Sequence, residues 1–164
     1  MGSSGAGKTT LLNTLNFRTS SKLHVTGDRC INGAPVGPHI ISSISAYVQQ
    51  DDLLFPRLTV NEHLNFCASL RLPAETSRRD KRRRVNEVLQ ELGLWNVKNH
   101  KIGSPTTFKG ISGGEKKRLA FASEILSDPN ILFCDEPTSG LDSFMAQTVV
   151  RIMHKMAARG KIIV

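Results

Sequence analysis

The sequence predicts an α/β fold with a mainly parallel sheet. Short apolar segments typical of strands alternate with amphipathic segments of helical period along the 164 residues. This alternation places helices against the faces of such a sheet. Hydrophobic residues make up 39% of the chain, which is enough for a packed core and argues against a disordered chain. The length suits one domain of ordinary size.

In the first third of the chain, a glycine-rich loop at residues 2–9 leads into a predicted helix, because leucines follow at helical spacing. Residues 23–48 predict short strands. Asn32-Gly33 is a hairpin turn signal, and apolar residues alternate from Ile44 to Val48. We expect a small antiparallel part of the fold in this region.

Two helices are predicted between residues 59 and 93. Thr59 and Glu62 have the spacing of a capping box, which begins a helix that runs through roughly residue 70. Ser77 can cap the next helix, and Gly93 stands where a C-terminal cap belongs. Apolar residues on this second helix share one stripe, which predicts a buried face.

The last part of the chain completes the alternation. A loop-rich connection is expected at residues 94–110, after which Ser112 and Glu115 make another capping box for a helix through about residue 126. An apolar strand follows at residues 131–134. The chain then predicts a helix from about residue 143 to 158 and the start of a further strand at residues 161–164.

The glycine-rich loop matches the P-loop pattern in every fixed position. Its glycines allow backbone amides to point inward around phosphate oxygens, and the following helix adds its positive N-terminal end. Lys8 supplies a mobile positive charge, and the Thr9 hydroxyl can bind Mg²⁺. The residues predicted to contact phosphate are Gly2, Ser3, Gly5, Ala6, Gly7, Lys8, Thr9 and Thr10.

Two adjacent carboxylates, Asp135 and Glu136, end the apolar strand. Because side chains alternate along a strand, we expect them to point in different directions and to have different roles. Asp135 suits a Mg²⁺ ligand, direct or through water, and Glu136 suits a group that orients or deprotonates an attacking water. An ordinary acidic turn is the alternative for this pair taken alone.

One short motif selects among the many proteins that contain a P-loop. Residues 111–115, Ile-Ser-Gly-Gly-Glu, resemble the LSGGQ signature of ABC ATPases. Ser112, Gly113 and Gly114 at a helix N-terminus form a second anion site. In the family that this motif resembles, two chains pair head to tail, and each signature closes over the ATP of the other chain.

Further segments resemble the remaining landmarks of ABC ATPases. Residues 46–52 resemble the Q-loop, whose lid glutamine is expected to be Gln50, with Gln49 as an alternative. Residues 139–142 resemble the D-loop, which crosses to the partner. The resemblance assigns catalysis to Glu136, Gln50 and Lys8, metal binding to Thr9, Gln50 and Asp135, and nucleotide contacts beyond the P-loop to Ser112, Gly113, Gly114 and Asp142.

Three longer stretches, residues 2–13, 58–64 and 135–143, resemble the White-type transporters of the ABC G subfamily. In that family an ATPase domain precedes a six-helix membrane domain, and the half-transporter must dimerise. The resemblance implies ATP and Mg²⁺ as ligands, ATP hydrolysis on the cytoplasmic side of a membrane, and transport of a small hydrophobic substrate. The implied partners are a second cassette, identical or different, and the membrane domain of the same full-length chain.

We expect residues 1–164 to be a fragment, a partial nucleotide-binding domain in which about 53–110 form the helical subdomain. Only Met1 precedes the P-loop, where a buried strand normally stands. The aromatic A-loop residue and the switch histidine of the family are expected beyond the ends of the sequence. Two alternatives stay open: a soluble ABC ATPase of DNA repair or translation, and a nucleotide-binding module that is inactive as a fragment.

The net charge of +8 is concentrated in one segment, because residues 78–84 carry six basic residues and one acid, or +5. This run has no aromatic neighbours, so we expect no nucleic acid partner. A solvated helix face is expected, with at most a weak attraction to anionic lipid. The five histidines lack metal-ligand spacing, the three cysteines suggest neither disulfide nor zinc, and Cys134 is expected to pack in the strand.

Overall fold

The computed structural model describes residues 1–164 apart from 1–2, 4, 20, 51–52 and 105–107. Its centre is a parallel sheet of order β3-β4-β5, formed by Ser45–Val48, Ile131–Cys134 and Ile162–Ile163. A small antiparallel sheet pairs β1 (Cys30–Ile31) with β2 (Ala34–Pro35) through the predicted turn, where Asn32 and Gly33 both have positive φ. The predicted α/β class with a mainly parallel sheet is confirmed.

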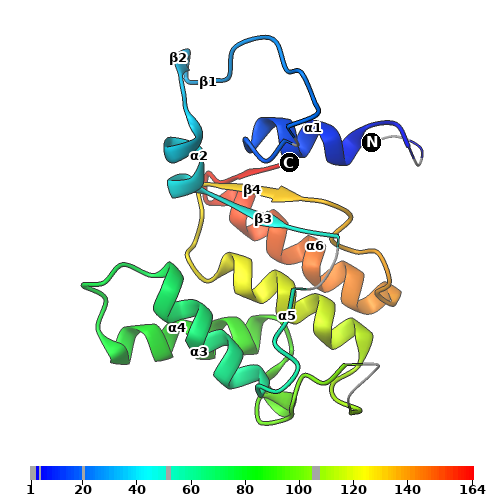
Figure 1. Ribbon diagram of the computed structural model, residues 1–164. Helices are drawn as coiled ribbons and strands as arrows, with labels where there is room; N and C mark the ends of the chain where they lie inside the picture. The colour runs from blue at the N-terminus through cyan, green and yellow to red at the C-terminus, as the bar shows by residue number, and fades with distance from the viewer. Residues whose placement is uncertain (1–2, 4, 20, 51–52, 105–107) are drawn as a thin grey trace.

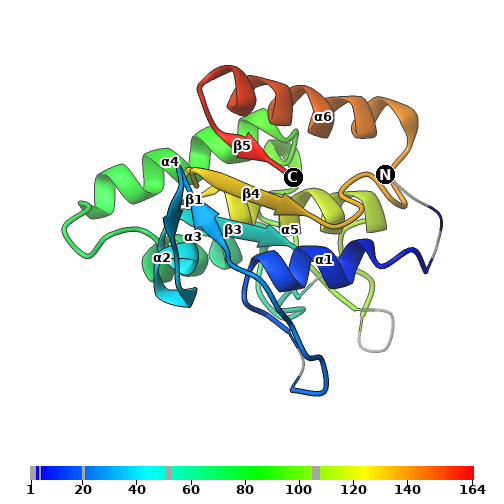
Figure 2. The ribbon, with the colours of Figure 1, turned by 90° about the horizontal axis from the view of Figure 1, so that it is seen from above.

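One face of the parallel sheet is covered by two helices, α1 (Lys8–Leu15) and α2 (Pro38–Ile44). Leu12 of α1 and Ile41 of α2 form a hydrophobic cluster with Tyr47, Ile131 and Phe133 of the sheet. Figure 1 shows α1 on this side of the strands, and Figure 2 shows the same arrangement from above.

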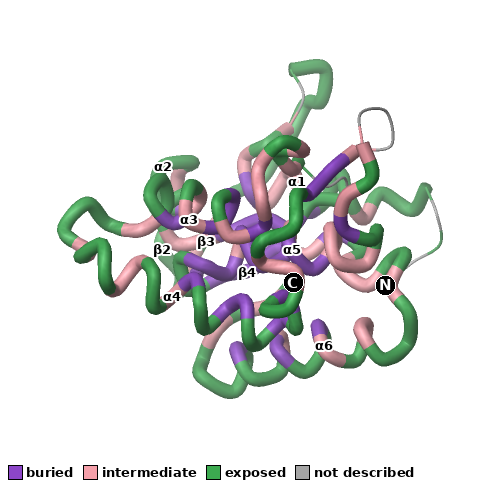
Figure 3. The backbone as a smooth tube through the Cα atoms, turned by 90° about the horizontal axis from the view of Figure 1, so that it is seen from below, coloured by how far each residue is buried: buried purple, intermediate pink, exposed green. Residues whose placement is uncertain are grey.

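The opposite face packs against the larger core, which includes residues of α3 (Val60–Arg71), α4 (Arg78–Glu91), α5 (Gly113–Ile125) and α6 (Ser143–Ala158). Buried residues are concentrated in the strands and in α5 (Figure 3). Because both faces of β3 are covered, Ala46, Tyr47 and Val48 are all buried, and the alternation expected of a half-exposed strand is absent there.

The predicted helix starts and stops are confirmed where capping residues marked them. Thr59 Oγ1 accepts a hydrogen bond from the amide of Glu62, whose carboxylate accepts one from the amide of Thr59. Ser77 caps α4 through the amide of Asp80, and Gly93 follows α4 with φ of 63°. The connection after α4 is loop-rich, with one short 3₁₀ turn at η1 (Trp95–Val97).

The prediction of strands throughout residues 23–48 is wrong for α2 (Pro38–Ile44). Proline at the first helical position has a suitable fixed φ and lacks only an amide that has no partner there. The hydroxyls of Ser42 and Ser43 donate to carbonyls one turn earlier within the helix. The apolar residues of this segment therefore serve a helix face rather than a strand.

The expectation of a fully solvated basic face at residues 78–84 also needs correction. The guanidinium of Arg84 is half-buried and donates to the carbonyls of Ile125 and Leu126 at 2.8 and 3.1 Å. It thereby satisfies backbone acceptors at the end of α5. Within the described ranges, no helix has both the length and the apolar character needed to cross a lipid bilayer.

Candidate functional site

The P-loop turns into α1 through two glycines in a left-handed conformation. Gly5 and Gly7 have φ of 79° and 85°, which costs a non-glycine residue about 1 kcal/mol or more. No heavy atom lies within 4 Å of a Cβ placed at either glycine, so conformation rather than crowding requires them. The described part of the loop is exposed, which leaves its amides accessible to phosphate oxygens.

Lys8 begins α1, and its side chain folds back over the loop. Its ammonium donates to the carbonyl of Ser3 at 3.0 Å, and the amide of Ala6 donates to the same oxygen at 3.2 Å. The positive charge of Lys8 therefore lies across the loop that was predicted to hold phosphate. Thr9 and Thr10 are exposed in the first turn of α1, whereas Gly2 lies outside the described residues.

A cavity of about 360 Å³ lies where β3 and β4 end, beside the first turn of α1. The strands are parallel, so the residues after Val48 and after Cys134 meet at one edge of the sheet, and the amide of Asp135 donates to the carbonyl of Val48. The residues that line the cavity are Thr9, Asn13, Arg18, Tyr47, Gln49, Gln50 and Asp135.

This cavity brings together the three residues predicted to bind metal: Thr9, Gln50 and Asp135. Gln49 lines it as well, so the choice between the two glutamines stays a prediction. Gln50 is exposed, and its backbone carbonyl accepts a hydrogen bond from the ammonium of Lys117. Lys117 belongs to α5, and this contact ties the signature helix to the edge of the cavity.

The cavity contains a buried negative charge. Asp135 is 3% exposed, and no cation lies within ion-pair distance of its carboxylate among the described residues. The pKa of the neighbouring Tyr47 is raised, first by burial and then by the charge of Asp135, while Arg18 above its ring opposes the shift. A buried carboxylate without a cation is costly, so this chemistry fits a bound metal ion.

Glu136 follows Asp135 but lies apart from the cavity. It is exposed and has φ of 51°, an uncommon value for a residue other than glycine. Its carbonyl accepts a hydrogen bond from the amide of Ser139, which makes a tight turn after β4. The contrast between a buried Asp135 and an exposed Glu136 agrees with the expected divergence of the two side chains. The described structure does not bring Glu136 or Lys8 to the lining of this cavity.

The signature segment forms the start of α5 as the capping box predicts. Ser112 Oγ accepts from the amide of Glu115 at 3.2 Å, and the carboxylate of Glu115 accepts from the amide of Ser112 at 2.7 Å. Ser112 and Gly113 are exposed. A Cβ on Gly114 would stand 3.6 Å from the side chain of Leu141, so the signature contacts the predicted D-loop within the chain. None of these residues lines the cavity at Thr9 and Asp135.

Asp142, predicted to contact nucleotide, is the N-cap of α6. Its Oδ1 accepts hydrogen bonds from the amides of Phe144 and Met145, at 3.1 Å each. Asp142 therefore has a structural role as a helix cap, and its side chain would have to contact nucleotide while it also caps α6.

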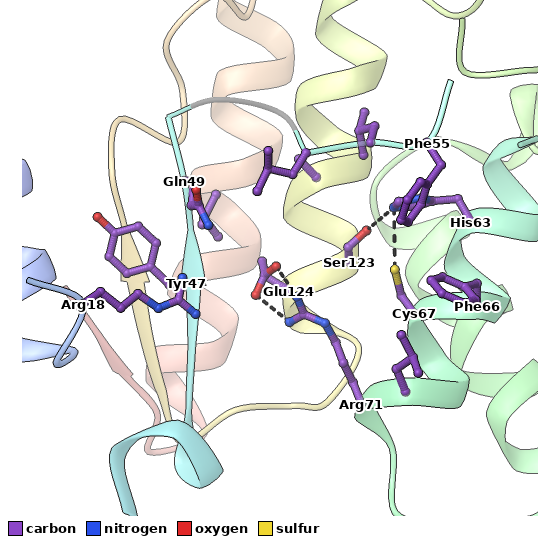
Figure 4. Close-up of a pocket in the computed structure, with 15 residues that line it drawn as sticks. Arg18, Tyr47, Gln49, Phe55, His63, Phe66, Cys67, Arg71, Ser123 and Glu124 are labelled. Carbon is purple, nitrogen blue, oxygen red and sulfur yellow. Dashed lines mark hydrogen bonds and ion pairs between the residues drawn. The ribbon is translucent and has the colours of Figure 1, made fainter. Parts of the chain in front are cut away.

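A second cavity of about 280 Å³ lies between β3, α3 and α5 (Figure 4). The guanidinium of Arg71 forms a bidentate ion pair with Glu124 on one wall. His63, Cys67 and Ser123 form a buried or half-buried hydrogen-bonded group on the other side. Arg18, Tyr47 and Gln49 line this cavity and the first one, and so form the wall between them.

Cys134 packs against the larger hydrophobic core, as expected for a residue of an apolar strand. In the described ranges, no three histidine, cysteine or acidic side chains form a group that could hold a metal ion. Burial raises the pKa of the Cys134 thiol to about 12, which makes a reactive thiolate unfavourable. Sequence reasoning missed Arg18, Tyr47 and Lys117. Arg18 follows α1 and Lys117 stands inside α5, with no motif to mark the tertiary contact of either.

The comparisons agree with the fold and with the order of the motifs. The sequence profile of the ABC transporter family matches residues 1–139. The chain belongs to the ABC transporter family. A dimeric ATP-binding cassette solved in a post-hydrolysis state with ADP and phosphate is 27% identical, with a TM-score of 0.79 over 100% of this chain and 71% of that structure.

Similar relatives include two white proteins and an ABCG transporter. The "Protein white" chains of Ceratitis capitata and Drosophila melanogaster are 51% and 52% identical over 166 residues. The broad substrate specificity transporter ABCG2 of Mus musculus is 43% identical over 164 residues. Each match covers all of this chain, and the chain spans about a quarter (24%) of each relative. The sequence thus corresponds to an ATP-binding domain of White and ABCG type.

Proposed function

We propose that this chain is part of the nucleotide-binding domain of a White-type half-transporter, which hydrolyses ATP to power transport of a small hydrophobic substrate across a membrane. The observation that carries the proposal is the meeting of Thr9, Gln50 and Asp135 in one cavity beside a P-loop. Similarity to the white proteins over the whole chain supports the transporter class. On this proposal, the domain lies on the cytoplasmic side, attached to a membrane domain, and about 53–110 form its helical subdomain.

The oxygen donors around the cavity fit Mg²⁺. Thr9 offers a hydroxyl, Gln50 an amide oxygen and Asp135 a buried carboxylate without a cationic partner among the described residues, and hard oxygen ligands are those that Mg²⁺ prefers. When bound, the ion would neutralise charge on the phosphates and help to orient them. Asp135 and Thr9 would hold it, with Gln50 contacting it from the lid side.

The remaining proposed roles belong to the P-loop, with Lys8, and to Glu136 in the turn after β4. Exposed amides of the P-loop would bind phosphate oxygens, and the Lys8 ammonium would exchange the Ser3 carbonyl for a phosphate oxygen. Glu136, exposed on its turn, would orient the attacking water and accept its proton. Catalysis in this class relies mainly on positioning and on charge stabilisation.

A second cassette is needed to complete the proposed site. The P-loop helix α1 and the signature helix α5 pack with opposite faces of the sheet, and the signature does not line the described nucleotide cavity. A signature from another chain, approaching head to tail, would reach the open side of that cavity. The exposed Ser112 and Gly113 are available for that contact, in a homodimer or a heterodimer.

The test is Glu136→Gln in the full-length protein. We expect ATP binding to stay within about twofold of wild type and turnover to fall by a factor of about 100 or more, because the amide cannot accept a proton. Glu91→Gln, the same change at an exposed position at the end of α4, is the matched control and should keep normal turnover. Wild-type turnover of Glu136→Gln would contradict the assignment.

Two alternative functions can be distinguished from the proposed one by experiment. A soluble ABC ATPase would lack a membrane domain in the complete chain, and the White-type identity argues against it. A module that only binds nucleotide would bind ATP but show no turnover. Measuring turnover on the 164-residue chain and on the full-length protein distinguishes an inactive piece from an inactive domain.

A further inference from the structure

A polar groove of about 700 Å³ lies between α3 and α4. Its α3 side presents residues spaced by four along the helix, and its α4 side presents mostly cations from the first two turns. Neither an acidic nor an apolar side chain is among its lining residues, which are Asn61, Asn65, Ser69, Arg78, Lys81, Arg82 and Asn86.

The fold does not use the cations of this groove. The side chains of Arg78, Lys81 and Arg82 make no hydrogen bond or ion pair with any described residue, whereas Arg83 pairs with Asp80 at 3.1 Å. The carboxylate of Asp80 also accepts from the hydroxyl of Ser77, so the one acid of the basic segment is already engaged. Arg78 and Lys81 stand in the first turn of α4, where positive charge opposes the helix dipole, so helix stability does not account for them.

Hydrogen bonds within α3 hold the side chains on the α3 side of the groove. The Asn65 amide nitrogen donates to both the carbonyl and Oδ1 of Asn61, at 2.8 and 2.9 Å. With Oδ1 occupied, Asn61 has its side-chain nitrogen left as a donor. The Ser69 hydroxyl donates to the Asn65 carbonyl, which fixes its oxygen. The groove is therefore lined by three positive charges, one N–H donor from Asn61, and the acceptor oxygens of Asn65 and Ser69.

We propose that the groove between α3 and α4 binds a ligand that carries clustered phosphate groups. Guanidinium groups bind phosphate through paired N–H donors, and an ammonium adds a mobile point charge. The volume is in the range of pockets that hold small ligands, and none of its residues lines the cavity of the P-loop. The ligand is either a free polyphosphorylated molecule or the polyphosphorylated headgroup of a membrane lipid. This proposal does not depend on the proposed function.

The test measures binding of inositol hexakisphosphate to the full-length protein with MgATP at saturating concentration, so that the nucleotide site is filled. The groove variant Arg78→Gln/Lys81→Gln/Arg82→Gln should raise the Kd at least roughly tenfold, because charged hydrogen bonds are lost. A control, Arg79→Gln/Arg151→Gln/Lys155→Gln, removes the same net charge at exposed positions outside the groove and should keep the Kd within about twofold. The single variant Arg82→Gln should give a smaller loss in the same direction.

A second arm identifies the source of the phosphate. Vesicles that contain phosphatidylinositol bisphosphate are compared with vesicles of equal charge made from phosphatidylserine. Binding of the soluble probe, lost in the groove variant, supports a free ligand; binding only to the phosphoinositide vesicles, lost in the same variant, supports a lipid headgroup. The proposal would be overturned by equal losses of binding in the groove and control variants, or by equal binding to both vesicle types. Tighter binding of an acidic peptide than of the phosphorylated probes, or no binding to any probe, would overturn it as well.

Discussion

His63 makes the stability of the domain depend on pH below neutrality. Its ring is 2% exposed, and Nε2 lies 3.1 Å from the hydroxyl oxygen of Ser123 (Figure 4). That hydroxyl donates its hydrogen to the carbonyl of Leu119, so the Ser123 oxygen accepts from His63 Nε2–H. Nδ1 is buried without a hydrogen-bond partner among the described residues. The folded state thus favours a neutral ring.

The magnitude follows from the pKa of this ring. Burial, and then the charge of Arg71, lower the pKa of His63 from 6.5 to about 4. A pKa difference of one corresponds to about 1.4 kcal/mol, so protonating the ring costs the folded state roughly 3 kcal/mol relative to the unfolded chain. As the pH falls, His63 binds its proton at a higher pH in the unfolded chain than in the folded chain. This stability is therefore fully present above pH 6.5 and is lost as the pH falls to about 4.

The assay is urea denaturation of the nucleotide-binding domain at a series of pH values from 7.5 to 4. His63→Gln keeps a donor for Ser123 but does not titrate, so its free energy of unfolding should fall less than that of wild type over this range. The carboxylates titrate in both proteins, and the difference between the two curves isolates His63. His100→Gln, at an exposed position, should keep the wild-type profile. Parallel curves for wild type and His63→Gln would refute the reasoning.

Two further changes test packing and capping by the same denaturation assay. Arg84→Met removes charged hydrogen bonds of 2.8 and 3.1 Å to the carbonyls at the end of α5 and should cost about 2 kcal/mol. Arg79→Met, on an exposed part of the same helix, should change stability by less than about 0.5 kcal/mol. Gly110→Ala would place Cβ 2.1 Å from the carbonyl oxygen of Ile102 and should cost about 3 kcal/mol or more. Gly37→Ala, with no atom within 4 Å, should cost less than about 1 kcal/mol, and equal losses at both glycines would contradict the close contact.

Local signals allowed much of the fold to be predicted. The capping boxes at Thr59 and Ser112 mark helix starts because both partners stand within one turn of the chain. The helix α2 was not predicted, because its isoleucines suit a strand as well as a helix, and Pro38 favours the helix. The capping of α5 by Arg84 joins residues 41 and 42 positions apart, and no local pattern reports such a contact.

The candidate site also contains residues that local motifs predict and residues that only tertiary packing brings into place. Thr9 and Asp135 could be predicted because each follows from a motif whose chemistry is local, and parallel strands bring the chain ends after β3 and β4 to one edge. Arg18 stacks over the ring of Tyr47 at 5.2 Å only because α1 packs against β3, which is a property of the tertiary structure. The capping role of Asp142 was not predicted, although an aspartate directly before a helix is typical of an N-cap.

The contact between Lys117 and Gln50 bears on how two proposed active sites communicate. The ammonium of Lys117 donates to the backbone carbonyl of Gln50, the predicted lid glutamine, and Lys117 lies on the helix that begins with the signature. In the proposed head-to-tail dimer, that signature serves the nucleotide of the partner, while Gln50 serves the nucleotide of its own chain. Each chain would then join the segment at its own nucleotide directly to the helix that serves the nucleotide of its partner, through a contact that no sequence motif reveals.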